Sequence, residues 1–241
     1  MKSRSLPAAG TETLALPSDF ASRIIGWYRV NARILPWRQD RNPYRIWVSE
    51  IMLQQTRVEA VIAYFERFMQ ALPTVEALAE APEELLMKLW AGLGYYRRAR
   101  YLHMCAQTLV SDCRGIFPDT VEGLRRLPGI GRYTAGAIAS IAFERPAPAV
   151  DGNVLRVLSR LTARTVTVDE AEAALLPRYP AGSCGDFTQS LMELGATVCL
   201  PNGAPDCPRC PFGGDCQAKL RGTPTAFPPP AVKPPRKIEE R

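Results

Sequence analysis

The sequence lacks the features that would place a protein in a membrane or in a secretory pathway. No stretch approaches the 18 or more consecutive apolar residues that a membrane-spanning helix needs. The segment before Ser18 has no continuous apolar core, which a signal peptide would require. We therefore expect an intracellular protein with no membrane partner, and a flexible N-terminus over residues 1–16.

Strand-like alternation is also missing, because no segment alternates apolar and polar residues at period two for long enough to suggest a sheet. Apolar side chains recur instead at helical spacing, for example at Val58, Val61, Ile62, Phe65, Phe68 and Met69. Asp119 with Glu122, and Thr167 with Glu170, have the spacing of helix capping boxes. Ser18, after Pro17, is expected to head the first helix. The sequence therefore predicts an all-α fold.

Lysine is scarce. Lysine and arginine together number 30, against 24 acidic residues, and only five of the 30 are lysines. The net charge of +6 suits a polyanionic partner, and arginine binds phosphate bidentately. A GC-rich genome would explain the arginine bias equally well. Lys88 is the only lysine between Lys2 and Lys219, so few amines are available for covalent chemistry.

Four of the seven cysteines fall close together, in the pattern C-x7-C-x2-C-x5-C formed by Cys199, Cys207, Cys210 and Cys216. In an intracellular chain this density indicates a metal site rather than disulfides. Four thiolates in one loop can hold tetrahedral zinc or a [4Fe–4S] cluster. Many zinc sites use two C-x-x-C pairs and this loop has one, which favours the cluster.

The segment LPGIGRYTAGAI, residues 127–138, is typical of a hairpin between two helices. Gly129 and Gly131 allow a tight backbone and the close approach of a ligand. We expect the next helix to begin between Arg132 and Thr134, so that its free N–H groups face the hairpin and bind a phosphate. A plain Pro-Gly turn is the structural alternative.

Two acidic residues stand in informative places. Glu50 lies in a mostly uncharged stretch, WVSEIMLQQT, just before a predicted buried helix face. Asp151 begins the segment DGNVLRVLSR. Taken singly, Glu50 could be a solvated surface residue and Asp151 an ordinary helix N-cap. Together on a DNA-binding scaffold they offer the acid and the anion that glycosidic bond cleavage needs.

The ordered motifs LPWR, PYRIWVSEIMLQQT, GLGYYRRARYLH, LPGIGRYTAGAI, DGNVLRVLSR and the four-cysteine loop resemble those of adenine DNA glycosylases, the MutY family of the helix–hairpin–helix endonuclease III-like superfamily. The resemblance covers about Leu35 to Ala218. It implies two helical lobes with DNA between them: a six-helix lobe over 43–144, and a cluster lobe from 17–42 and 145–221. The proline-rich segment 222–241 would then be a linker to a recognition domain beyond this catalytic region.

The resemblance also implies the chemical roles of individual residues. Glu50 would be the acid that protonates adenine N7, and Asp151 the carboxylate that stabilises the oxocarbenium-like sugar. Asn153 would orient the site. Tyr133 stands where bifunctional lyases of the superfamily carry lysine. Since a tyrosine cannot form a Schiff base, the expected product is an intact strand with an abasic site.

Further residues would contact DNA. Gln55 and Tyr95 correspond to side chains that enter the base stack while adenine is flipped out, although core packing is the alternative for Tyr95. Arg38 would line the pocket or neighbour the acid. The other expected DNA contacts are Gln54, Thr56, Leu93, Gly129, Gly131, Arg132 and Thr134. The four cysteines would hold a [4Fe–4S] cluster, with a first gap of seven residues where the family usually has six.

The implied partner is double-stranded DNA that contains an A·8-oxoguanine or A·G mispair, bound by a monomer in the bacterial cytoplasm or nucleoid. Three alternatives remain. A thymine-mismatch glycosylase would also lack the lysine, although the context of Glu50 and MLQQT favours adenine. An endonuclease III-like lyase conflicts with the scarcity of lysine. A non-catalytic DNA-binding module conflicts with the presence of both carboxylates.

Overall fold

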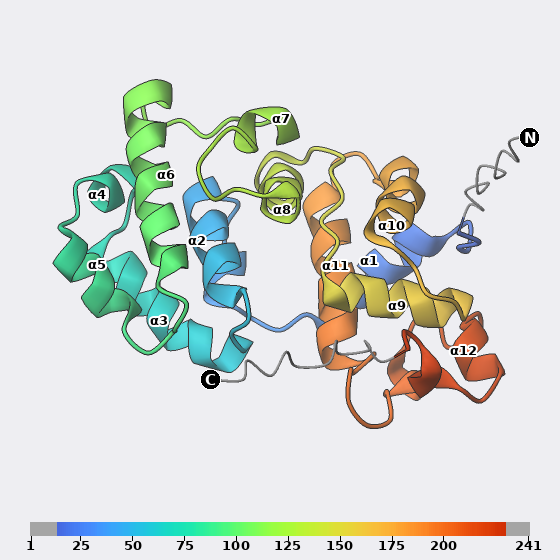
Figure 1. The fold of residues 1–241 in the computed structure, drawn as a ribbon. Helices are drawn as coiled ribbons and strands as arrows, with labels where there is room; N and C mark the ends of the chain where they lie inside the picture. The colour runs from blue at the N-terminus through green and yellow to red at the C-terminus, as the bar shows by residue number, and fades with distance from the viewer. Residues whose placement is uncertain (1–13, 230–241) are drawn as a thin grey trace, which may run out of the picture.

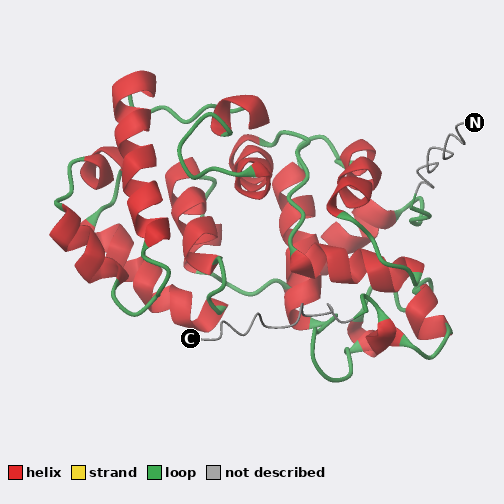
Figure 2. Cartoon of the chain, in the orientation of Figure 1, coloured by secondary structure: helices red, strands yellow, loops and turns green. Residues whose placement is uncertain are grey.

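The computed structural model describes residues 14–229, and all regular secondary structure in that range is helical (Figure 2). This confirms the all-α prediction. None of the described helices is long and apolar enough to cross a membrane. The α-helices are α1 Phe20–Asn31, α2 Pro43–Leu53, α3 Val58–Ala71, α4 Val75–Ala79, α5 Glu83–Trp90, α6 Arg97–Cys113, α7 Val121–Leu124, α8 Arg132–Phe143, α9 Gly152–Thr162, α10 Val168–Leu175, α11 Cys184–Thr197 and α12 Gln217–Leu220. Short 3₁₀ turns occur at Pro36–Arg38, Leu176–Arg178, Cys207–Arg209 and Pro224–Ala226.

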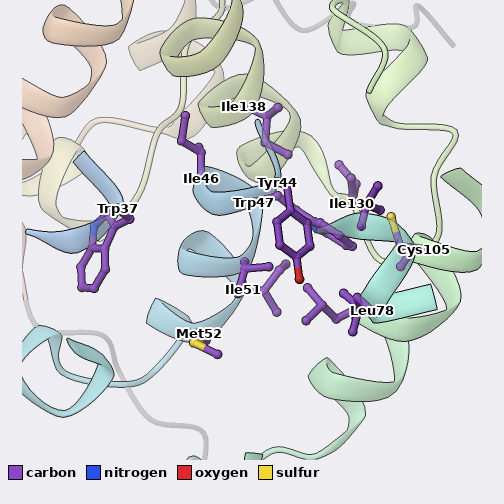
Figure 3. Packing of buried hydrophobic residues seen from close by; sticks show 14 of the residues in the cluster. Trp37, Tyr44, Ile46, Trp47, Ile51, Met52, Leu78, Cys105, Ile130 and Ile138 are labelled. Atoms are coloured by element: carbon purple, nitrogen blue, oxygen red, sulfur yellow. The ribbon is translucent and has the colours of Figure 1, made fainter. Parts of the chain in front are cut away.

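One hydrophobic core lies among helices α2 to α8 (Figures 1 and 3). Trp47 and Trp90 are among its fully buried side chains. The sequence predicts six helices over 43–144, whereas the structure has seven, α2 to α8, of which α4 and α7 are only five and four residues long. Leu35 and Trp37 also belong to this core, so the chain enters this lobe earlier than the predicted boundary at residue 43.

A second core joins α1 to α9, α10 and α11, which lie at the opposite end of the molecule in Figure 1. Phe20 stacks on Phe212 with ring centroids 4.7 Å apart, and this contact ties α1 to the cysteine-rich loop. Leu14 is buried in the same core. The predicted flexible segment 1–16 is therefore packed at its described end, and residues 1–13 lie outside the described range.

Helix α8 joins the two lobes, because it packs against α2 on one side and α11 on the other. Its buried face is made largely of alanine and glycine, and such small residues let neighbouring backbones approach closely. A Cβ added at Gly136 would lie 2.2 Å from the carbonyl oxygen of Pro148, so no other residue fits there without a shift of the backbone. The site between the lobes is thus built around a closely packed central helix.

The local sequence signals were right in part. Thr167 and Glu170 form the predicted capping box. The predicted box at Asp119 is wrong: Thr120 caps α7 through its side chain, and Asp119 pairs instead with Arg145.

The two chain-end predictions also need adjustment. The first helix begins at Phe20 with Asp19 as its N-cap, two residues after Ser18. The described part of the predicted linker, 222–229, is not a free tether, since the Arg160 Nε atom donates to the carbonyl of Phe227 at 2.9 Å. Residues 230–241 lie outside the described range.

Candidate active site

A cavity of about 520 Å³ lies between the lobes, and side chains from α2, α8, α9 and α11 line it. All four residues with predicted chemical roles line this cavity: Glu50, Tyr133, Asp151 and Asn153. Four of the predicted DNA contacts line it as well, namely Arg38, Gln54, Gln55 and Thr56. The fold therefore brings together residues that are far apart in the chain.

Glu50 is held on α2, whose start is fixed by Pro43 and by the Asn42 side chain, which accepts from the N–H groups of Tyr44 and Arg45. The Glu50 side chain is buried, with the residue only 7% exposed. The alternative that Glu50 is a solvated surface residue is therefore wrong. The Tyr133 hydroxyl donates a hydrogen bond of 2.7 Å to Glu50 Oε2 and so fixes the orientation of the carboxyl group.

Burial raises the pKa of Glu50 to about 7, because the cavity wall disfavours the charged form. The hydrogen bond from Tyr133 and the charge of Arg38 lower this pKa, whereas the nearby Asp151 raises it. A carboxyl group with a pKa near 7 is partly protonated at neutral pH, which an ordinary glutamic acid is not. This property suits a group that must donate a proton.

Asp151 is the N-cap of α9, as the interpretation of this residue as an ordinary helix cap predicts. Its Oδ1 atom accepts from the N–H of Val154 at 2.8 Å, and its Oδ2 atom accepts from Asn153 Nδ2 at 2.7 Å. Burial raises the pKa of Asp151, and these hydrogen bonds oppose that rise. The capping role and a role in the cavity are compatible, because the same contacts hold a carboxylate against the cavity.

Asn153 is itself held by Arg156, which the sequence did not suggest. Arg156 Nη2 donates to Asn153 Oδ1 at 2.7 Å, and the Arg156 Nε atom donates to the carbonyl oxygen of Cys199 at the same distance. Gly195 lets α11 approach, since a Cβ there would lie 2.4 Å from the Asn153 Cβ atom. A hydrogen-bonded path therefore leads from Asp151 through Asn153 and Arg156 to the cysteine-rich loop.

A second buried carboxylate, Glu193 on α11, also lines the cavity and was missed by the sequence analysis. Arg33 Nε donates to it at 2.7 Å and Arg38 Nη2 at 2.8 Å. Burial acts to raise the pKa of Glu193, but the two arginines outweigh it and hold the pKa at about 2. Glu193 is therefore a fixed anion that orients Arg33 and Arg38. A carboxylate in the otherwise apolar run SLMELGA was the available signal.

Two loops are named the rim loops: residues 54–57 after α2, which line this cavity, and residues 91–96 after α5, which line a neighbouring one. Gln55 and Tyr95, one in each loop, have left-handed backbones, with φ of 58° and 48°. Such a conformation costs a residue other than glycine about 1–3 kcal/mol. Tyr95 is 65% exposed, so the core-packing alternative is wrong for it, whereas Leu93 is buried.

A second cavity, of about 400 Å³, lies beside the first, and Gln54 and Gln55 line both. Tyr95, Tyr96 and Tyr101 supply aromatic surface to this cavity, and Gly129 of the hairpin also lines it. Exposed aromatic rings with arginines among them offer stacking surfaces and positive charge to a nucleic acid.

The hairpin before α8 has the expected form, with Gly129 at φ 75° and with Gly131 as the N-cap of a helix that begins at Arg132. No side chain caps this helix end, so its first N–H groups face outward without a side-chain partner. The Thr134 side chain is buried. Arg132 is half-exposed and forms ion pairs with Asp169 and Glu172 of α10.

The four clustered cysteines line one small cavity in the second lobe. Arg160 Nη1 donates to Cys199 Sγ at 3.3 Å, and the Cys216 thiol donates to the Arg160 carbonyl at 3.3 Å. Burial, with a smaller contribution from the neighbouring sulfurs, raises the pKa of the Cys210 thiol to about 12. Four thiolates would therefore coexist here only when bound to a cationic centre, so these residues fit such a group.

Comparison with known proteins agrees with this geometry. Residues 48–180 match the model of the HhH-GPD superfamily base excision DNA repair proteins. The adenine DNA glycosylase of Mus musculus is 46% identical over 221 residues, covering 84% of this chain and 42% of the mouse protein. That of Arabidopsis thaliana is 43% identical over 231 residues, covering 81% and 36%. The chain thus spans less than half the length of these two relatives.

Solved structures give the same fold. A thermostable thymine-DNA glycosylase superposes with a TM-score of 0.75 at 28% identity, covering 84% of this chain and 95% of that structure. A trapped endonuclease III–DNA covalent intermediate gives a TM-score of 0.70 at 25% identity, covering 83% and 95%. The family model itself matches more than half of the chain. On these grounds the chain belongs to the HhH-GPD superfamily of base excision DNA repair proteins.

Proposed function

We propose that this chain is a DNA glycosylase that hydrolyses the N-glycosidic bond of adenine mispaired with 8-oxoguanine or guanine in double-stranded DNA. The observation that carries the proposal is a single cavity holding Glu50, with a pKa of about 7, beside Asp151. The names of the relatives at 43% and 46% identity support adenine as the base removed.

In this mechanism Glu50 is the general acid. A flipped adenine enters the cavity, and the protonated Glu50 carboxyl donates its proton to N7. The electron pair of the glycosidic bond then moves to the base, which leaves as neutral adenine. Tyr133 holds the carboxyl in place and donates to the carboxylate that remains.

Asp151 stabilises the positive charge that develops on the sugar as the bond breaks, either electrostatically or through a transient bond to C1′. Its two oxygens are held by Val154 and Asn153, so the anion needs little reorganisation during the reaction. Addition of water to C1′ then gives the abasic site. The proton that this water releases restores the protonated form of Glu50.

The product should be an unbroken strand, because Tyr133 offers no amine for a Schiff base. Lys88 lies on α5, and among residues 14–229 no lysine lines either of the cavities beside the rim loops. Borohydride should therefore trap no protein–DNA adduct during the reaction. A trapped adduct with the wild-type protein would show lyase chemistry instead.

The four clustered cysteines are proposed to hold a [4Fe–4S] cluster, which would act as a structural tie for its loop. Among the described residues no group of three or more His, Cys, Asp and Glu side chains is arranged to hold a single metal ion. The single C-x-x-C pair of the loop favours the cluster over one zinc. Purified protein should contain about four irons per chain, whereas one zinc and no iron would refute the cluster.

Single-turnover excision tests the proposal, with duplexes that contain A·8-oxoguanine, A·G, A·T or T·G at one position. We expect adenine release from the first two and little from A·T. Thymine release from T·G, with intact adenine elsewhere, would favour the thymine-mismatch alternative suggested by the likeness to the thymine-DNA glycosylase. Binding of all duplexes without release of any base would favour the alternative of a non-catalytic DNA-binding module.

A further inference from the structure

The side chain of Arg98, near the start of α6, connects the two rim loops. Its Nη1 atom donates to the carbonyl oxygens of Ile51, Met52 and Gln54 at 2.8, 3.0 and 2.5 Å. Its Nη2 atom lies within hydrogen-bond distance of the Leu93 and Gly94 carbonyls and of Thr56 Oγ1, at 3.1 to 3.3 Å. One guanidinium group therefore holds both loops, which are 34 or more residues apart in sequence.

The contacts to α2 have a clear physical reason. The last carbonyl groups of a helix lack partners within the helix and carry partial negative charge, so a cation stabilises them. Helix α2 has no basic residue in its last turn. Arg98, from another helix, supplies that cation and thereby fixes the point at which the loop carrying Gln55 leaves α2.

The rest of the Arg98 environment is unusual for an arginine. The described residues offer it no ion pair with a carboxylate, and its buried Nε atom has no hydrogen-bond partner. Its guanidinium lies 5.4 Å from the ring centre of Trp90 and 5.7 Å from that of Tyr95, where it can make cation–π contacts. Every hydrogen-bond partner of Arg98 is thus a neutral oxygen in or beside a rim loop.

We propose that Arg98 is a positioning residue that makes the two rim loops one unit, so that Gln55 and Tyr95 enter the base stack together. This inference rests on the proposed function, because it assigns the loops to base extrusion. Its consequence is selective: loss of Arg98 should impair extrusion of a paired base and spare the cleavage chemistry of Glu50 and Asp151. Lysine keeps the charge but has a single nitrogen, which cannot reach both loops.

The test compares two substrates in single-turnover excision, A·8-oxoguanine and an unpaired adenine in a one-nucleotide bulge, for which extrusion costs much less. Arg98→Lys should be slower than wild type by about tenfold or more on the pair, and by less than about threefold on the bulge. Arg100→Lys is the matched control, because Arg100 is exposed on the same helix and its one ion pair within the described range is with Glu83. It should match wild type on both.

A second readout does not depend on excision. A 2-aminopurine placed beside the mispaired adenine should brighten when wild-type protein opens the stack. Arg98→Lys should bind with a Kd within about threefold but lose most of this increase. Thr56→Val removes one acceptor of Arg98 and should give a smaller change in the same direction, should Arg98→Lys fail to fold.

The outcomes separate the two proposals. An equal slowing of Arg98→Lys on both substrates, or a full fluorescence increase, would overturn the positioning role. Wild-type protein that brightens 2-aminopurine but releases adenine from neither duplex would refute the proposed function, while the comparison of fluorescence would still decide the role of Arg98.

Discussion

The cavity between the lobes and the rim loops beside it are built in opposite ways. In the cavity, the ionisable groups are buried and held by fixed partners, as with Glu50 and Tyr133. In the rim loops, Tyr95 is exposed and two non-glycine residues have left-handed backbones, and Arg98, which holds the loops from α6, has only neutral hydrogen-bond partners among the described residues. From this difference we propose two roles: the cavity would set the protonation states that bond cleavage needs, and the rim loops would act on the DNA stack. The following predictions test these two roles.

Glu50→Gln should have the largest effect. The amide keeps the shape of the side chain but has no acidic proton to give, so excision should slow by about 10²- to 10⁴-fold or more. The affinity for DNA should stay within a few-fold of wild type, because the rim loops are unchanged. Excision rates and binding are measured on the same A·8-oxoguanine duplex. Wild-type excision by this variant would remove the role assigned to Glu50.

Asp151→Asn should come next, with a loss of about 10²- to 10³-fold. Asparagine caps helices as well as aspartate does, so this change removes the charge and keeps the cap. The change loses the hydrogen bond from Asn153 but also relieves the burial of a charge, so the melting temperature should fall only slightly, which differential scanning calorimetry can check. A small loss of rate that follows a lowered melting temperature would mean that Asp151 serves α9 rather than the reaction.

Tyr95→Ala should slow excision of the paired adenine by roughly tenfold, the cost of losing one stacked aromatic ring. The rate on a bulged adenine should change much less. Single-turnover assays on both duplexes measure this contrast, with Tyr96→Ala as a neighbouring comparison of an exposed tyrosine. Equal losses on the two duplexes would mean that Tyr95 contributes to the cavity rather than to extrusion.

Glu50 should also leave a signature in stability. Because its pKa rises from 4.5 to about 7 on folding, the native state holds more protons than the unfolded state between these values. Stability should therefore fall as pH rises through this window, by up to about 3 kcal/mol in total. Glu50→Gln should remove this cost, so its melting temperature should exceed that of wild type more at pH 8 than at pH 5. Parallel pH dependences of the two proteins would contradict the raised pKa.

The smallest effect is expected at the hairpin. Asp169 and Glu172 pair with the half-exposed Arg132, and such surface pairs contribute little. Asp169→Asn with Glu172→Gln should free Arg132 for phosphate and raise the affinity for DNA by about two- to threefold at low salt. Titration at two salt concentrations measures this. Weaker binding by the double variant would show that the ion pairs organise the hairpin.

Motifs in the sequence were sufficient to predict the all-α fold class and several of the residues that line the cavity. Helical periodicity predicted the α-helices, and the resemblance placed Glu50, Tyr133 and Asp151 in one site. Short helices such as α4 were missed, because a five-residue segment has no readable period. Arg33, Glu193 and Arg98 were missed for another reason: their importance arises from partners more than 35 positions away in the chain. A local pattern can show that a charge is unusual, as for Glu193 in its apolar run, but it does not identify the partners.

The central claim is that Glu50 is the proton donor of the reaction, and the pH dependence of excision tests it most directly. Single-turnover rates on A·8-oxoguanine should be nearly constant well below pH 7, about half-maximal near pH 7, and should fall about tenfold per pH unit well above it, as a general acid with a pKa of about 7 requires. Glu50→Gln should lose this alkaline decline along with its activity. A wild-type rate that stays constant from about pH 6 to pH 9 would contradict the account.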